Sequence, residues 1–351
     1  MNVRITGSGS YIPTEKVTNL DFSKHNFLNA DGTPFPYSNE DVARKFLGIT
    51  GIKERRYVTD DLTTSDIATI AAQKAVTDSG IDIETLDYII LAHNFGDVKH
   101  GVIQGDTVPS LATRVKHNLK IKNPKCVAYD VLFGCPGWVE GFIQAQAFIK
   151  AGMAKKCLVI GAETLSRVSD KSDRDSMIYS DGAGATVIEA TEEEGFLSYE
   201  SATFAYDEAY YLHFGNSYDK DANQDIRYIK MQGRKIYEFA LNNVPAAMKS
   251  CLEKANIPIE QLKKILIHQA NEKMDEAIVQ RFYKQFGQTP PEGIMPMSIH
   301  WLGNSSVATI PTLYDSLIKG EIENQKLNKG DVLLFASVGS GMNINAILYR
   351  F

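Results

Sequence analysis

The sequence predicts an α/β fold in which strands alternate with helices and in which the chain is built from two similar halves. Short runs rich in Ile, Val and Leu are separated by segments with helical spacing, a pattern typical of sheets covered by helices on both faces. The strand candidates are Tyr88–Ala92, Leu158–Ile160, Thr186–Glu189, Ile265–Ile267 and Val332–Ala336. With 351 residues the chain also exceeds the usual size of a single domain.

Internal similarity supports the two halves. Ala71–Leu91 and Ala247–Ile267, which are 176 positions apart, both contain a helical pattern, then Ile-x-Ile-Glu-x-Leu, then an apolar strand. A second match, 169 positions apart, aligns Gly134-Cys135 with Gly303-Asn304. Two matches in the same order, near half the chain length, indicate a duplicated unit. We expect the halves to be residues 1–190 and 191–351.

Composition limits the class of protein. A hydrophobic content of 44%, a charged content of 23% and a net charge of −6 are ordinary for a globular protein and give no attraction toward nucleic acid or anionic membranes. Met1–Gly7 alternates like a strand and lacks the features of a signal peptide, and no apolar run reaches the ~18 residues of a membrane span. None of the four cysteines has zinc-site spacing. We expect a cytoplasmic protein with free thiols.

Two segments depart from the repeating pattern. Phe27–Asn39 is polar and contains Gly and Pro turn signals, and Tyr206–Tyr228 is rich in Tyr, Asp and Asn. We interpret both as surface excursions, the second as a lid or a pocket wall.

Cys135 is the first candidate for chemistry. It precedes Pro136, which suits the first turn of a helix, and Trp138, Phe142, Ala145 and Ile149 then follow with the spacing of one helix face. A thiol at a helix N-terminus faces unpaired N–H groups, which favour the nucleophilic thiolate. The alternative is a small buried apolar residue.

Two residues of the second half are further candidates. His268 follows the strand Ile265–Ile267, where open α/β sheets place ligands, and Asn304 occupies the position that matches Cys135. The alternatives are a hydrogen-bonded histidine at a strand end and an asparagine that caps a helix. The runs Asp181–Ala185 and Gly339–Gly341 match no phosphate-binding fingerprint.

These residues lie in motifs that resemble the β-ketoacyl-acyl carrier protein synthase III family of thiolase-fold condensing enzymes. The motifs occur in family order over nearly the whole chain. They are Thr50–Arg56, Gly134–Gly137, Ser180–Ala185, Met231–Arg234, His268–Asn271 and Gly303–Ser306.

The resemblance implies a thiolase-like, five-layered αβαβα fold with mixed sheets, and a homodimer. It implies that Cys135 accepts an acyl primer as a thioester, while His268 and Asn304 hold the thioester carbonyl of a malonyl extender on acyl carrier protein. Loss of CO2 then leaves an enolate that attacks the acyl group. The backbone N–H groups of Cys135 and Ser340 would form an oxyanion hole. The reaction needs no metal, flavin or nicotinamide.

The resemblance also suggests residues that bind the acyl carrier protein or the substrate thioester, which are Arg174, Asn271, Lys273 and Gly233. For Lys273 the alternative is a solvated charge on a helix. Lys45 and Ile49 depart from the family, which commonly carries Trp and Arg there to bind coenzyme A. The departure predicts a carrier-protein donor, or an unusual coenzyme A ester, in place of acetyl-CoA. The stretch Asp97–Asp106 looks like an insertion that reshapes the primer tunnel.

Two other functions share these motifs. A non-decarboxylating acyltransferase would acylate Cys135 and pass the acyl group to a hydroxyl or an amine. A non-catalytic scaffold that binds acyl carrier protein would leave the three polar residues without a role, which is unfavourable because buried unpaired polar groups destabilise a protein. The motifs therefore favour the decarboxylating condensing enzyme.

Overall fold

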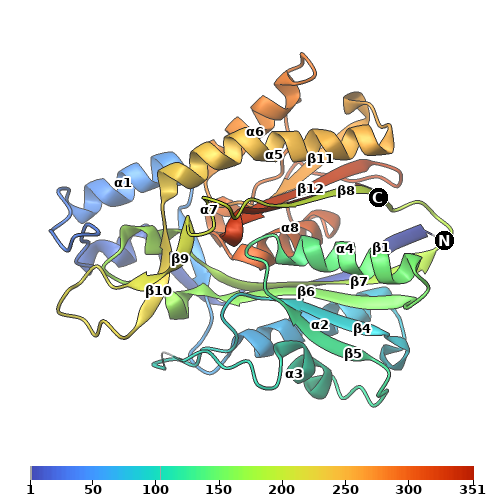
Figure 1. The fold of residues 1–351 in the computed structure, drawn as a ribbon, viewed down its shortest axis with the longest axis horizontal. Coiled ribbons are helices and arrows are strands. Elements are labelled where there is room, and N and C mark those ends of the chain that lie inside the picture. The colour runs from blue at the N-terminus through green and yellow to red at the C-terminus, as the bar shows by residue number, and fades with distance from the viewer. Residues whose placement is uncertain (1, 103) are drawn as a thin grey trace.

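The computed structural model, which describes residues 2–102 and 104–351, has five layers of helices and sheets (Figure 1). Helices α4 and α8 lie between the two sheets and contact both, whereas α2 and α3 cover one outer face and α5 and α6 the other. The fold class predicted from the sequence is therefore confirmed. The helices are α1 (Asn39–Thr50), α2 (Thr64–Ser79), α3 (Leu111–Asn118), α4 (Gly137–Lys150), α5 (Gly233–Ala255), α6 (Glu272–Lys284), α7 (Ile299–Leu302) and α8 (Thr309–Ile318).

Each sheet is mixed, and the four-stranded second sheet repeats the topology of four strands of the five-stranded first sheet. The first has the order β1-β7-β6-β4-β5 and the second the order β11-β12-β13-β8. The strands are β1 (Asn2–Tyr11), β4 (Tyr88–Ala92), β5 (Val127–Val131), β6 (Lys156–Thr164), β7 (Asp181–Thr191), β8 (Phe196–Thr203), β11 (Leu262–Ile267), β12 (Val332–Gly339) and β13 (Asn343–Arg350). All five strand candidates lie within these strands.

The duplication is visible in strand direction. In the first sheet β4 is parallel to β6, β6 is antiparallel to β7, and β7 is antiparallel to β1. In the second sheet β11, β12, β13 and β8 follow with the same sequence of directions. A short 3-10 turn precedes both β4 and β11, at Ile83–Thr85 and Ile259–Gln261, as the internal repeat indicates. The division at residues 190 and 191 stays a prediction.

Helix α4 forms the centre of the core between the sheets. The four residues predicted to share a face, Trp138, Phe142, Ala145 and Ile149, are each 0% exposed. The Trp138 ring packs edge-to-face against Phe335 of the second sheet, with ring centroids 5.7 Å apart. This packing fixes the start of α4, and therefore the loop that carries Cys135, relative to both halves.

Two short hairpins extend beyond the layers. One pairs β2 (Glu15–Thr18) with β3 (Glu54–Tyr57), and the other pairs β9 (Leu212–Asn216) with β10 (Arg227–Met231). Among the described residues, no helix combines the length and apolar character needed to cross a bilayer.

Candidate active site

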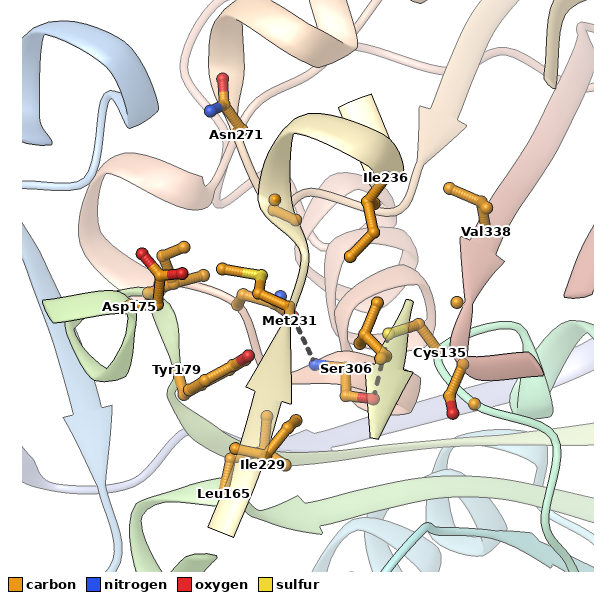
Figure 2. A pocket seen from close by; sticks show the side chains of 18 of the residues that line it. Cys135, Leu165, Asp175, Tyr179, Ile229, Met231, Ile236, Asn271, Ser306 and Val338 are labelled. Atoms are coloured by element: carbon orange, nitrogen blue, oxygen red, sulfur yellow. Dashed lines mark hydrogen bonds between the residues drawn. The ribbon is translucent and has the colours of Figure 1, made fainter. Parts of the chain in front are cut away.

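One cavity of about 720 Å³ collects the three predicted catalytic residues. Cys135 comes from the first half and His268 and Asn304 from the second, and all three line the cavity. Figure 2 shows Cys135 beside Ser306, with Leu165, Tyr179 and Ile229 on another side of the cavity. The sequence therefore placed in one site the residues that the fold brings together.

Cys135 lies in the turn between β5 and α4. Gly134 before it has φ 66°, a left-handed conformation that favours glycine, and Pro136 caps the helix that starts at Gly137. Burial raises the pKa of the Cys135 thiol to about 11, although a hydrogen bond from the Ser306 hydroxyl at 3.3 Å favours the thiolate. The helix start predicts a lowered thiol pKa, and that direction is wrong, because burial outweighs the donors around the sulfur.

The turn at Cys135 packs backbone to backbone against the end of β12. A Cβ atom at Gly134 would lie 2.5 Å from the Ser340 nitrogen, and one at Gly339 would lie 2.4 Å from the Cys135 nitrogen. Only glycines permit this approach, and Cys135 and Ser340 both line the cavity. Their use as an oxyanion hole stays a prediction.

His268 directly follows β11, as expected. Its backbone N–H donates to the Ala336 carbonyl at 2.8 Å, which extends the ladder between β11 and β12 by one bond. The side chain is 4% exposed, and its Nδ1 has no hydrogen-bond partner among the described residues. Burial lowers the pKa of His268 to about 4, so the imidazole is neutral at neutral pH. A neutral imidazole retains one N–H donor.

Asn304 is fixed by its backbone and by one end of its side chain. Its N–H donates to the Ile178 carbonyl at 3.0 Å, and its carbonyl accepts from Ser180 N–H at 2.8 Å. The side-chain oxygen accepts from Ser306 N–H at 2.8 Å. Since that oxygen is occupied, the side-chain NH2 is the group that Asn304 can offer to a ligand in the cavity.

The predicted binding residues divide into two groups. Arg174, Asn271 and Gly233 line the cavity. Arg174 also lies over the ring of Phe35, 4.7 Å from its centroid, and the Asn271 side chain caps α6 by accepting from Met274 N–H at 3.1 Å. Lys273 does not line the cavity but is exposed on α6.

The residues that depart from the family pattern lie at the cavity wall. Lys45 and Ile49 of α1 both line the cavity, and Lys45 Nζ sits 3.2 Å from the centroid of the Tyr37 ring. Phe35 and Tyr37 line it too, so the surface excursion Phe27–Asn39 also contributes to the cavity wall. Phe35 is half-buried there, whereas Tyr37 is 50% exposed.

The other two unusual segments differ in their relation to the cavity. The segment Tyr206–Tyr228 contributes Leu212, His213 and Phe214, which agrees with its interpretation as a pocket wall. Within Asp97–Asp106, whose position 103 lies outside the described residues, none of the described residues lines the cavity of this chain. Asp97 instead accepts from Ser65 and Arg114, so that stretch is tied to α2 and α3.

Three polar residues near Cys135 had no role assigned from the sequence. They are Asn94 after β4, Glu163 in β6 and Ser306 before α8. Glu163 could have been singled out because a carboxylate directly after the apolar run from Cys157 to Ala162 implies a buried charge. Asn94 carries no comparable signal. Ser306 belongs to the motif Gly303–Ser306, in which only Asn304 was assigned a role from the sequence.

Comparisons with known proteins agree with this fold. Residues 129–204 match the family model described as 3-oxoacyl-[acyl-carrier-protein (ACP)] synthase III, and residues 252–351 match its C-terminal model. The chain is 33% identical to the beta-ketoacyl-[acyl-carrier-protein] synthase III of Bacillus pumilus, over 100% of this chain and 99% of the relative.

Solved structures give the same result. The 3-oxoacyl-[acyl-carrier-protein] synthase III from Aquifex aeolicus is 30% identical, with a TM-score of 0.81 over 100% of both chains. The priming β-ketosynthase of the R1128 polyketide pathway has a TM-score of 0.81 at 22% identity, over 100% of this chain and 96% of that one, and supports the fold alone. The chain belongs to the 3-oxoacyl-[acyl-carrier-protein] synthase III family of condensing enzymes, which are acyltransferases with a thiolase-like fold.

Proposed function

We propose that Cys135 accepts an acyl primer and that His268 and Asn304 promote a decarboxylative condensation of that primer with a malonyl-type extender on acyl carrier protein. The observation that carries the proposal is the single cavity lined by all three side chains. A nucleophile and two neutral donors in one cavity are what a two-step acyl transfer needs.

The first step moves the acyl group onto the protein. The Cys135 thiol loses its proton, the sulfur bonds to the carbonyl carbon of the primer thioester, and the old carbon–sulfur bond breaks. The proton ends on the released carrier thiol. The negative oxygen of the tetrahedral intermediate would accept hydrogen bonds from the backbone N–H groups of Cys135 and Ser340, two residues that line the cavity.

The second step forms the carbon–carbon bond. The bond from the extender to its carboxylate breaks and CO2 leaves, so that negative charge develops on the thioester oxygen. The neutral His268 N–H and the Asn304 NH2 are suited to stabilise that oxygen. The enolate carbon then attacks the acyl carbonyl, and the bond to the Cys135 sulfur breaks and releases a β-ketoacyl product. The sulfur leaves as a thiolate, which takes a proton from water and returns to the thiol.

The acyl donor is proposed to be a carrier-protein thioester or an unusual coenzyme A ester. Lys45 and Ile49 at the cavity wall supply neither the aromatic ring nor the guanidinium that commonly binds coenzyme A in this family. Arg174 and the exposed Lys273 are basic groups suited to an acidic carrier protein. A homodimer and a cytoplasmic location belong to the same proposal.

Release of CO2 tests the function. We expect the protein, given an acyl donor and malonyl-acyl carrier protein, to release one CO2 for each β-ketoacyl product, and the Cys135→Ala variant to form no product. Transfer of the acyl group to a hydroxyl or an amine without CO2 would instead identify a non-decarboxylating acyltransferase. A protein that takes no acyl group from any donor would be a scaffold.

A further inference from the structure

A buried chain of polar groups ends on the sulfur of Cys135. The Ser306 hydroxyl lies 3.3 Å from the sulfur, Asn94 Nδ2 lies 3.2 Å from that hydroxyl, and the same Nδ2 lies 2.7 Å from a Glu163 carboxyl oxygen. These hydrogen bonds connect the ends of β4 and β6 to the loop before α8. None of these three residues takes part in the steps described above.

Each hydrogen bond between Asn94, Ser306 and Cys135 is donated toward the sulfur. The Asn94 NH2 group has two protons, and it donates one to Glu163 and one to the Ser306 oxygen. The Ser306 oxygen thereby accepts, so its own proton is free to be donated to the Cys135 sulfur. A hydroxyl held in this orientation stabilises a thiolate more than a thiol.

The backbone of Ser306 is built to hold this orientation. Its φ is 53°, a left-handed value that is uncommon for residues other than glycine, and its N–H donates to the Asn304 side-chain oxygen at 2.8 Å. Strained conformations of this kind persist where the surroundings over-determine them, and they cluster at active sites. Figure 2 shows both Ser306 hydrogen bonds, with the hydroxyl directed at Cys135.

Burial strengthens the arrangement. Ser306 is 4% exposed and Glu163 is 0% exposed, so water competes little for these hydrogen bonds. The titratable groups around the sulfur are Glu163, whose negative charge would oppose a thiolate, and His268 and Tyr179, which line the same cavity. Asp181 in turn faces Glu163. Ser306 is the side-chain donor to the sulfur among the described residues.

We propose that Ser306 is a further catalytic residue, which donates a hydrogen bond to the Cys135 sulfur as the thiolate forms, and that Asn94 and Glu163 are positioning residues that orient its hydroxyl. This inference rests on the proposed function, in which Cys135 accepts the primer. Ser306 keeps its own proton throughout. The hydrogen leaves the Cys135 sulfur and ends on the released carrier thiol, as the sulfur bonds to the acyl carbon.

The rate at which iodoacetamide alkylates Cys135 at different pH values tests the proposal. Below the pKa of the thiol this rate is proportional to the fraction of thiolate. We expect Ser306→Ala and Ser306→Gly each to lower the rate at pH 8 roughly tenfold, as loss of one charge-assisted hydrogen bond would do. We expect Asn94→Leu to lower it less, because the hydroxyl remains but is no longer oriented. Peptide mass spectrometry separates Cys135 from Cys126, Cys157 and Cys251.

The controls distinguish a lost donor from a damaged fold. Glycine tolerates the φ of Ser306, so Ser306→Gly removes the hydroxyl without backbone strain. Ser305→Ala removes a neighbouring hydroxyl of similar burial and should alkylate at the parent rate. Loss of structure would expose the thiol and raise the rate.

Two outcomes have different meanings. If both Ser306 variants alkylate at the parent rate while the parent protein is acylated by a carrier thioester, the proposal for Ser306 is overturned and the proposed function stands. If the parent protein is never acylated on Cys135, the proposed function fails, whatever the alkylation rates are.

Discussion

Replacing Gly339 by alanine should slow catalysis strongly while the protein still folds. The new methyl group would lie 2.4 Å from the Cys135 nitrogen and 2.7 Å from Pro136 Cδ, whereas ordinary contacts begin near 3.4 Å. One of the two loops must therefore move by about 1 Å. The backbone of Gly339, with φ −164° and ψ −163°, is extended, so the contact rather than the conformation excludes a side chain.

The size of the effect follows from that displacement. A shift of about 1 Å between catalytic groups can lower a rate by roughly 100-fold, and overpacking costs about 1–3 kcal/mol of stability. We expect Gly339→Ala to fold, with a modest loss of stability, and to form β-ketoacyl product about 100-fold more slowly.

Initial rates and thermal melting would be measured together. Gly48→Ala is the matched control, because a methyl group there meets nothing within 4 Å and should leave the rate unchanged. A folded Gly339→Ala protein with the parent rate would refute the view that close approach of these two loops forms the site.

Three further predictions concern the donors, one buried carboxyl group and the acyl donor. His268→Ala and Asn304→Ala should each slow condensation by roughly 100-fold or more while acylation of the cysteine changes little, and equal losses in both steps would contradict the assigned roles. Burial raises the pKa of Glu163 from 4.5 to about 8, so the parent protein should lose stability as pH rises from about 4.5 through 8. Glu163→Gln lacks this carboxyl group, so its free energy of unfolding, relative to that of the parent, should rise by up to roughly 4 kcal/mol between pH 4.5 and pH 8. Urea unfolding at both pH values measures this difference. A difference that stays constant with pH would show that the carboxyl group titrates normally. Lys45→Trp combined with Ile49→Arg should increase labelling by acetyl-CoA roughly tenfold, and unchanged labelling would argue against these positions as the cause.

Much of the fold follows from local pattern. The strands around Ile89 and Ile265 are continuous apolar runs, because both faces of each sheet are covered by helices. The internal repeat gave the equivalence of the two halves. Local pattern does not determine which segments reach the cavity. Phe35 and Tyr37 lie in a polar stretch rich in turn residues, yet both line the cavity.

The sequence predicted which residues form the site better than it predicted their pKa values and hydrogen bonds. Cys135, His268 and Asn304 each stand at the end of a recognisable element, and the topology brings those ends together. The pKa of the thiol depends on how many atoms surround the sulfur, which no local motif reports, so the helix start alone gave the wrong direction. The hydrogen bonds that link Glu163, Asn94 and Ser306 join segments far apart in the sequence, so no local motif predicts them.

Locating the acyl group tests the central claim most directly. The folded protein would be offered a panel of acyl-carrier-protein and coenzyme A thioesters, and its intact mass and peptides would then be analysed. The account predicts one acyl group per chain, carried by Cys135 and absent from Cys135→Ala. An acyl group on Cys126, Cys157 or Cys251, or no adduct from any donor, would contradict it.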